Sequence, residues 1–504
     1  MTSDAETVPD SPPKPEAPSP SPGKASPGKK RPGSRPALKL KTAGDGSPSA
    51  LVRSGARPSQ RSTPRASRKD SPASQRSGSP SQRSQRKRKS KKGEASSNGN
   101  GSAPAGDEVT PVDAAAEVQL ALEQLRAATL SGDSVVRSIE LRSSGLESLP
   151  EWLDQLDLGT LEELDVDDNA LKALPERIFS RLTRLRLLSV LKNQLTELPA
   201  ALGDLESLHI LRVGRNALTE LPACLERLAN LKELVASANQ LGALSPSLGS
   251  MQSLELLGLG RNKLVTLPSS IGSLSRLREL SVSTNSLTAL PDDICRLASL
   301  EKLYAYENQL GALPDDMGAL QKLRVLHVHT NQLTCLPASI CTLGSLEILS
   351  TEENHITELP TAIGELHSLR ELWISTNQLT ALPDSIGALA CLEKFGAPEN
   401  SLAGLPESIG QLSSLRELYV NDNQIVSFPA SLGGLACLET MFAFANPLQN
   451  EAGEMLTALP ADMLSGMPVL RDLRLPAMPS TPTGVSALGR EADEDSPGSS
   501  LGVE

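Results

Sequence analysis

Apolar residues recur along most of this chain in a spacing that hardly varies. The segment over residues 277–291 reads LRELSVSTNSLTALP, and the same frame returns many times. Its Leu-x-Val core alternates with period two, which predicts a short strand with Leu280 and Val282 turned inward and their neighbours turned outward. The Leu-Pro-x-x-Ile-Gly-x-Leu half that follows is expected to return the chain along the opposite side.

Asparagine marks each unit at one position of this frame. The first interval between these residues is 24 and every later one is 23, through Asn169, Asn193, Asn216, Asn239, Asn262, Asn285, Asn308, Asn331, Asn354, Asn377, Asn400, Asn423 and Asn446. An earlier unit has Ser144 in the same slot, which makes 14 units, and a degraded fifteenth ends near Leu475. A fixed period of this length indicates a solenoid.

A single unit cannot bury its own leucines, whereas stacked units form one continuous core. The Asn side chain can hydrogen-bond the backbone of neighbouring coils and satisfy groups that a tight turn leaves unpaired. The predicted fold is therefore an α/β solenoid over residues 136–475. It is a leucine-rich-repeat horseshoe with a parallel β-sheet on its concave face.

Composition divides the rest of the chain. Residues 1–100 carry 22 Lys and Arg against 7 Asp and Glu, a net charge of +15, whereas the remaining chain has a net charge of −26. The first 100 residues contain no Phe, Trp or Tyr, so they cannot bury enough apolar surface to fold. We predict a disordered basic Ser/Pro-rich tail over 1–110, a capping helix over 111–135 and a disordered acidic tail over 476–504.

The 23-residue repeat with its Leu-Pro-x-x-Ile-Gly-x-Leu half resembles the Ras-group intracellular leucine-rich-repeat proteins. These include the animal scaffold of the Ras–Raf pathway and related plant proteins, and the resemblance covers residues 136–475. It implies an intracellular signalling scaffold whose concave face docks other proteins. Small GTPases, kinases or phosphatases are the partners that it implies.

Neither a catalytic motif nor a cofactor motif is present: the chain lacks a phosphate-binding Gly-x-x-x-x-Gly-Lys-Ser/Thr loop, His-Glu-x-x-His and Gly-x-Ser-x-Gly. We predict that the protein is not an enzyme and needs no cofactor or metal; an enzyme or an enzyme's regulatory subunit is the least favoured class. None of the six cysteines forms a Cys-x-x-Cys pair, which favours a reducing, intracellular compartment. No apolar run is long enough for a transmembrane segment.

Aromatic residues concentrate at the outward positions of the later strands. Six of the ten Phe, Trp and Tyr residues of the chain lie there, accompanied by two histidines and two acidic residues. The predicted partner-binding residues are Tyr304, Tyr306, His327, His329, Trp373, Tyr419, Phe442, Phe444, Glu352 and Glu353. Aromatic rings on an exposed surface are typical of binding hot spots. Two alternatives stay open: the rings fill space inside the curve, and His327 and His329 with Glu352 bind zinc.

Charged residues of the same face fall into groups. An acidic group is followed by a basic one and by a second acidic one, comprising Glu163, Asp165, Asp167 and Asp168, then Arg212, Arg215 and Arg261, then Glu352, Glu353, Glu399 and Asp422. The last group favours a partner with a basic, partly apolar patch.

The tail contains a dense basic run of nuclear-localisation type, namely Arg86, Lys87, Arg88, Lys89, Lys91 and Lys92. It could equally contact RNA, DNA or anionic lipid. Any contact with nucleic acid would lack sequence specificity, because no aromatic residue interleaves with the run. Two function classes result: a signalling scaffold, or a nuclear or nucleic-acid-associated adaptor. The expected location is the cytoplasm, the nucleus or both.

Overall fold

The computed structural model describes residues 38–42, 123, 127, 136–450 and 452–476. The predicted capping helix over 111–135 falls almost entirely outside these residues, although Glu123 and Ala127 are helical and exposed. The basic run at 86–92 and the acidic tail from 477 onward also lie outside the described residues.

The described strands form one sheet in sequence order. They are β1 (Leu38–Thr42), β2 (Val136–Leu141), β3 (Glu163–Asp165), β4 (Leu187–Ser189), β5 (Ile210–Arg212), β6 (Glu233–Val235), β7 (Leu256–Gly258), β8 (Glu279–Ser281), β9 (Lys302–Tyr304), β10 (Val325–His327), β11 (Ile348–Ser350), β12 (Glu371–Trp373), β13 (Lys394–Gly396), β14 (Glu417–Tyr419), β15 (Thr440–Phe442) and β16 (Asp472–Arg474).

A short helix follows most strands, usually of the 3₁₀ type. The 3₁₀ helices are η1 (Glu151–Gln155), η2 (Leu158–Thr160), η3 (Ala200–Asp204), η4 (Ala223–Arg227), η5 (Pro246–Ser250), η6 (Ser269–Ser273), η7 (Asp292–Arg296), η8 (Met317–Ala319), η9 (Ala338–Thr342), η10 (Ile363–Glu365), η11 (Asp384–Ala388), η12 (Glu407–Gln411) and η13 (Ala430–Gly434). Two short α-helices also have bounds within the described residues, α2 (Glu176–Phe179) and α3 (Ala461–Ser465).

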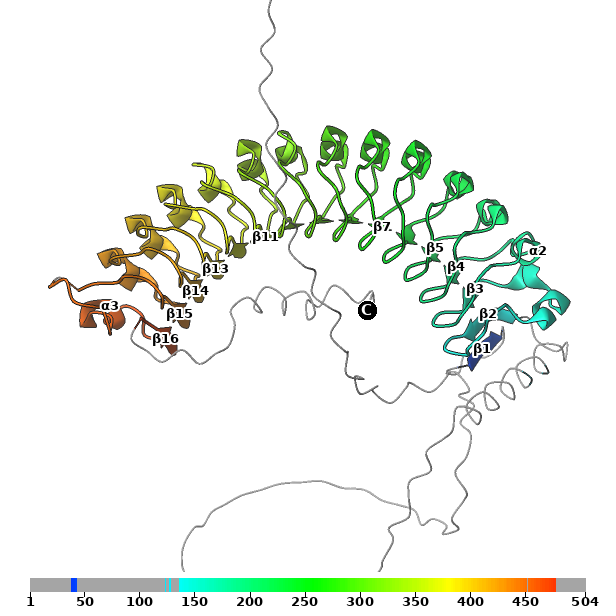
Figure 1. Cartoon of the computed structure of the whole chain (residues 1–504), viewed down its shortest axis with the longest axis horizontal. Helices are drawn as coiled ribbons and strands as arrows, with labels where there is room; N and C mark the ends of the chain where they lie inside the picture. The colour runs from blue at the N-terminus through cyan, green and yellow to red at the C-terminus, as the bar shows by residue number, and fades with distance from the viewer. Residues whose placement is uncertain (1–37, 43–122, 124–126, 128–135, 451, 477–504) are drawn as a thin grey trace, which may run out of the picture. The chain divides into compact units, whose positions relative to one another are not determined.

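Strands β2 to β16 run parallel, and each pairs with the strand of the next coil. They lie on the inner side of the curved solenoid, whereas the short helices lie on its outer side (Figure 1). The predicted leucine-rich-repeat horseshoe with a concave parallel sheet is confirmed. The described helices include none that is long and apolar enough to span a membrane.

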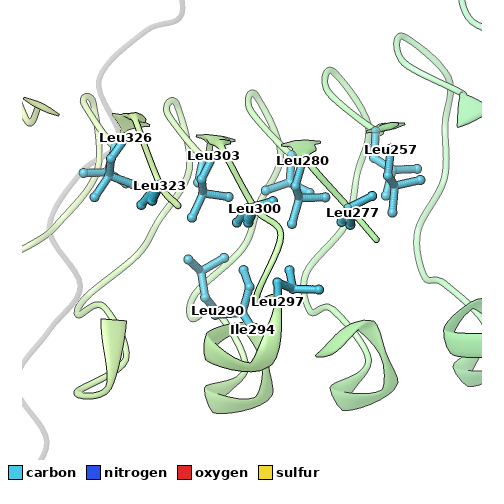
Figure 2. Packing of buried hydrophobic residues seen from close by; sticks show 14 of the residues in the cluster. Leu257, Leu277, Leu280, Leu290, Ile294, Leu297, Leu300, Leu303, Leu323 and Leu326 are labelled. Atoms are coloured by element: carbon cyan, nitrogen blue, oxygen red, sulfur yellow. The ribbon is translucent and has the colours of Figure 1, made fainter. Parts of the chain in front are cut away.

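Both halves of each coil contribute to one continuous core. In the coil around residues 277–300, Leu277 and Leu280 face inward from the strand side, and Ile294 and Leu297 face them from the helical side (Figure 2). All four side chains are completely buried. Burial of a leucine side chain stabilises by about 1.5–3 kcal/mol, so the stacked leucines are the main source of stability.

The asparagines lie inside the turns, as predicted, and hold adjacent coils together. The Asn331 amide group donates hydrogen bonds to the carbonyl oxygens of Ala305 (3.1 Å) and Val328 (3.0 Å). Its Oδ1 accepts one from the backbone N–H of Leu310 (3.0 Å). Ala305 and Leu310 belong to the preceding coil, so one side chain satisfies backbone groups of two coils.

The residue before each of these asparagines, here called the tip residue, has a left-handed backbone conformation. From Asp168 to Ala445 every tip residue has φ between 50° and 57°. Threonine occupies the position at Thr284, Thr330 and Thr376. Since β-branched residues rarely adopt positive φ, the hydrogen bonds of the stacked coils impose this conformation on them.

One element lies where the sequence predicted only disorder. Strand β1 pairs antiparallel with β2, with Leu38 opposite Leu141 and Leu40 opposite Ile139. Its sequence, LKLKT, alternates apolar and basic residues with period two, which is a strand pattern. The composition of the surrounding segment concealed this local signal. As a result, β1 covers the edge of the parallel sheet.

Glycine allows close packing between the helical sides of neighbouring coils. A Cβ atom at Gly387 would lie 2.3 Å from the backbone oxygen of Ser408, and one at Gly410 would lie 2.0 Å from that of Ser431. At Gly311 nothing lies within 4 Å of such an atom. The glycine of the Ile-Gly pair is therefore required by contact with the next coil.

We expect Gly387→Ala to destabilise the protein by about 1–3 kcal/mol, the usual cost of overpacking. The matched change Gly311→Ala should alter the free energy of unfolding by less than about 0.5 kcal/mol. Urea unfolding followed by circular dichroism measures both. Equal effects of the two substitutions would show that the contact with Ser408 does not limit the stacking.

Candidate protein-binding face

Residues of successive strands form a row across the concave sheet. Strand pairing aligns, in order, Ser281, Tyr304, His327, Ser350, Trp373, Gly396, Tyr419, Phe442 and Arg474. A second row, two residues further along each coil, contains Tyr306, His329, Glu352 and Phe444. The structure thus brings the predicted site residues together into two clusters of rings, with Ser350 and Glu352 of the intervening coil between them.

The first cluster spans β9 and β10. Tyr306 and His329 stack with ring centroids 4.5 Å apart and planes within 11° of parallel. Tyr304 meets His327 edge-on at 5.4 Å. All four residues are half-buried, although both ring nitrogens of His327 are fully buried.

The second cluster spans β12 to β16. Trp373 and Tyr419 are nearly parallel, with centroids 6.0 Å apart, and Tyr419 meets Phe442 edge-on at 5.2 Å. The Arg474 guanidinium carbon lies 4.2 Å from the centre of the Phe442 ring, a cation–π contact. Phe444 lies 6.3 Å from Phe442 and is half-buried.

Gly396 explains how Trp373 reaches a residue two strands away. A Cβ atom at Gly396 would lie 2.4 Å from Cε3 of Trp373, so the indole ring lies directly over this glycine. The indole N–H donates to Glu371 (3.1 Å), and the Tyr419 hydroxyl donates to Glu417 (3.0 Å). Burial, reinforced by Glu417, raises the pKa of Tyr419 well above its ordinary value.

The aromatic side chains of this face differ in how far they are buried. Tyr419 and Phe442 each retain only 7% of their exposure, so they pack within the face and are not the exposed anchors that the sequence predicted. Trp373, Phe444 and the first cluster stay half-exposed. The space-filling alternative therefore describes Tyr419 and Phe442, whereas the other rings form the surface that a partner could reach.

The histidine pair contacts tyrosines, and its acidic neighbour is engaged elsewhere. Glu352 accepts a hydrogen bond from the Ser350 hydroxyl. In the part of the chain that the structure describes, no group of three or more His, Cys, Asp or Glu side chains is arranged to hold a metal ion. Glu353 is exposed and accepts a hydrogen bond from Thr330 (3.2 Å).

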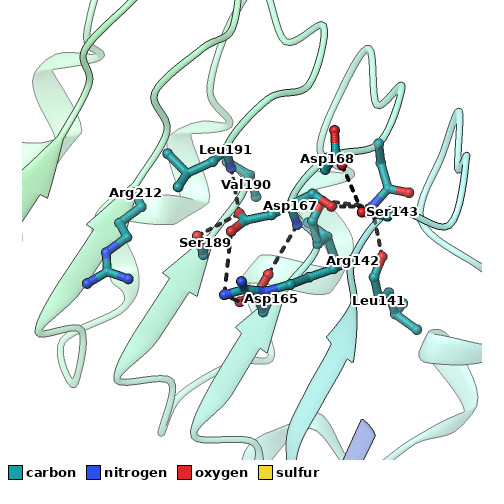
Figure 3. A network of polar contacts seen from close by, with 12 residues as sticks. Leu141, Arg142, Ser143, Asp165, Asp167, Asp168, Ser189, Val190, Leu191 and Arg212 are labelled. Atoms are coloured by element: carbon teal, nitrogen blue, oxygen red, sulfur yellow. Dashed lines mark hydrogen bonds and ion pairs between the residues drawn. The ribbon is translucent and has the colours of Figure 1, made fainter. Parts of the chain in front are cut away.

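Two carboxylates of the first acidic group are buried within the face. Asp165 and Asp167 are buried at 6% and 8% exposure, and Arg142, a residue not recognised from the sequence, contacts both (Figure 3). Asp167 also accepts hydrogen bonds from the Ser189 hydroxyl (2.6 Å) and the Leu191 N–H (2.7 Å). Burial raises the pKa of Asp167, partly offset by Ser189. These carboxylates therefore connect the first coils to one another.

We expect Arg142→Gln to destabilise the protein by about 1–2 kcal/mol, because two buried carboxylates lose their cation. This loss of stability is smaller than the loss expected on breaking a fully buried ion pair, because 48% of the Arg142 side chain is exposed. A matched control is Arg227→Gln, which breaks the exposed Arg227–Asp204 pair (2.9 Å) and should have little effect. Urea midpoints test both; similar midpoints for the two variants would contradict the structural role of Arg142.

An alternating charge ladder also escaped sequence analysis. Ten consecutive coils carry a basic and an acidic residue in turn at the position after the first leucine of the repeat, from Lys232 to Glu439. The pairs Arg278–Glu301, Arg324–Glu347 and Arg370–Glu393 have N–O distances of 3.1, 2.9 and 2.6 Å. The ladder therefore has a period of two coils and neutralises its own charge.

The early part of the concave face contains a shallow hollow of about 600 Å³ across β3 to β7. Its apolar lining is Leu187, Ile210 and Leu256. At its border Arg212 pairs with Glu233 (2.6 Å), which accounts for one of the three predicted basic residues of this region. Arg215 and Arg261 are tip residues.

Two families of leucine-rich repeats match segments of the solenoid. The family described as Leucine-rich repeat region matches residues 306–379, and the family described as Leucine rich repeat matches residues 159–218 and 252–310. A search of curated proteins finds no match.

Solved structures with the same fold come from several sources. A leucine-rich-repeat protein of Leptospira interrogans is 28% identical, with a TM-score of 0.56, and the match covers 69% of this chain and 97% of that one. A TDR receptor is 26% identical, with a TM-score of 0.59, over 71% of this chain and 66% of that one. An internalin of Listeria monocytogenes is 20% identical, with a TM-score of 0.55, over 71% and 94%. Fold, repeat matches and structural likeness together define a protein with the leucine-rich-repeat architecture.

Proposed function

We propose that this protein is a non-catalytic scaffold that binds other proteins through the concave face between β9 and β16. The observation that carries the proposal is the pair of aromatic clusters on this face, with Tyr304, Tyr306, Trp373 and Phe444 half-exposed. Large rings held in place by neighbours lose little conformational freedom on binding, which is why they dominate interface energetics.

The resemblance of the repeat to Ras-group proteins supports a role in intracellular signalling. Small GTPases, kinases or phosphatases are then the partner classes, and the cytoplasm or the nucleus is the location. The runner-up is a nuclear or nucleic-acid-associated adaptor, which is favoured by the basic run from Arg86 to Lys92 alone. An enzyme or enzyme regulatory subunit remains the least favoured class.

Capture of partners by the full chain tests the proposal. We expect Trp373→Ala and Tyr306→Ala each to weaken partner binding by about 1–3 kcal/mol, the range of interface hot spots. Val265→Ala is a matched control, because it removes an apolar side chain that is 51% exposed and lies beyond the Asn turn. Isothermal titration with a captured partner gives the affinities.

The two function classes give different results in the same assay. Replacing the six basic residues of the run at 86–92 with glutamine should leave the partners of the concave face bound. Partners that are lost only from this variant would instead support the adaptor class. Unchanged affinity in both aromatic variants would reject the concave face as the binding surface.

A further inference from the structure

Acidic side chains recur at every second coil along one edge of the concave sheet. The tip residues alternate as Thr284, Glu307, Thr330, Glu353, Thr376 and Glu399, and Asp422 follows in the next coil. We call Glu307, Glu353, Glu399 and Asp422 the acidic edge. All four are exposed, and the edge runs beside the rings of Tyr306, His329 and Phe444.

The charge of the acidic edge is oriented but not neutralised. Glu307 accepts a hydrogen bond from Thr284 (3.0 Å), and Glu353 and Glu399 accept equivalent bonds from threonines of the preceding coil at 3.2 Å. None of the ion pairs within the described residues involves a member of the acidic edge. The glutamates of the charge ladder instead each pair with a basic residue, as Glu255 does with Lys232 and Glu347 with Arg324. The acidic edge therefore offers its charge to a ligand.

We propose that the acidic edge and the adjoining rings bind a basic segment in the polyproline II conformation, with Lys or Arg at every third residue. This inference rests on the proposed function, since it specifies the chemistry of a partner for the same face. The segment would run across the strands, along the curve of the solenoid, with its cations toward the glutamates and its other side chains over the rings.

The spacing of the glutamates favours this conformation. Neighbouring parallel strands lie about 4.8 Å apart, so carboxylates on alternate coils recur about every 9.6 Å. A polyproline II helix has three residues per turn and rises about 9.3 Å per turn, so every third side chain points the same way at nearly this interval. In an α-helix, side chains on one face recur about every seven residues, a rise of about 10.5 Å. The mismatch with the spacing of the carboxylates is then roughly three times that of a polyproline II helix.

The aromatic surface beside the edge fits the same ligand. Polyproline II segments bind grooves lined by aromatic side chains, and their fixed backbone loses little entropy on binding. Trp373 and the stacked Tyr306–His329 pair provide such rings on two sides of β11. The acidic edge adds a charge pattern that selects basic over neutral proline-rich segments.

A buried acceptor at Asn421 points independently to a ligand at this face. Asn421 lies in the second row, beside Phe444, and is 1% exposed. Its amide group donates to Asp422 of the acidic edge (2.8 Å), but its Oδ1 has no hydrogen-bond partner within the described residues. Buried acceptors are nearly always satisfied in folded proteins. A backbone N–H of a bound segment, or its arginine, is the kind of donor that this acceptor lacks.

Two labelled peptides of equal composition test the inference on the full chain. One repeats Arg-Pro-Pro, and the other has all its arginines in one block followed by all its prolines. We expect the periodic peptide to bind about tenfold more tightly in fluorescence anisotropy, equivalent to ~1.4 kcal/mol. The triple variant Glu307→Gln, Glu353→Gln, Glu399→Gln should abolish this preference.

A control variant changes the net charge by the same amount but leaves the acidic edge intact. Glu197→Gln, Glu220→Gln and Glu358→Gln together replace three exposed glutamates beyond the Asn turns and should keep the preference. Equal affinity for the two peptides, or a preference that survives in the triple variant of the acidic edge, overturns the inference. Tighter binding of an alanine-rich helical peptide with arginine at every seventh residue also overturns it.

The experiments distinguish a failure of the proposed scaffold function from a failure of the inferred polyproline II ligand. If Trp373→Ala abolishes partner capture while the peptides show no preference, the face binds proteins and only the periodic ligand is wrong. If Trp373→Ala and Tyr306→Ala leave partner capture unchanged while the periodic peptide is preferred, the acidic edge is a ligand site and the aromatic scaffold proposal is wrong.

Discussion

The hydrogen bonds of the buried asparagines are the constraint on which this structure depends. Every turn between the concave strands and the descending loops contains backbone groups that cannot reach water. A single side chain such as Asn331 satisfies groups of its own coil and of the preceding one. Since a buried polar group without a partner costs about 1–3 kcal/mol, each coil must keep its register with the next. The left-handed tip residues and the regular spacing of the acidic edge follow from that register.

The regular stacking of the coils determines the surface of the concave face. Because register places equivalent residues side by side, the character of the face depends on a few substitutions at repeated positions. Gly396 is the decisive one, since its missing side chain lets Trp373 lie flat and approach Tyr419. Tyr419 and Phe442 then support the exposed rings from within.

Much of the fold could be predicted from the sequence, because the same pattern of apolar and polar residues recurs in every repeat. The strand positions, the buried leucines and the role of the asparagines all follow from one 23-residue frame. What a frame cannot reveal is contact between side chains whose direction depends on neighbours. The burial of Tyr419 and the pairing of Arg142 with Asp165 depend on such contacts. The two-coil charge ladder does alternate in the sequence, but the structure is needed to show that its members pair. Strand β1 was missed for the opposite reason, since its short alternating pattern lies in a segment whose composition indicates disorder.

The two-coil period of the charge ladder has a consequence for how this solenoid can change in length. Loss of the single coil that contains Glu347 would bring Arg324 and Arg370 onto neighbouring strands, where like charges repel. Loss of two successive coils would restore an arginine beside a glutamate. The threonines and glutamates at the turns obey the same rule. Within the ten coils of the ladder, duplications and deletions should therefore be tolerated in multiples of 46 residues, twice the interval between asparagines.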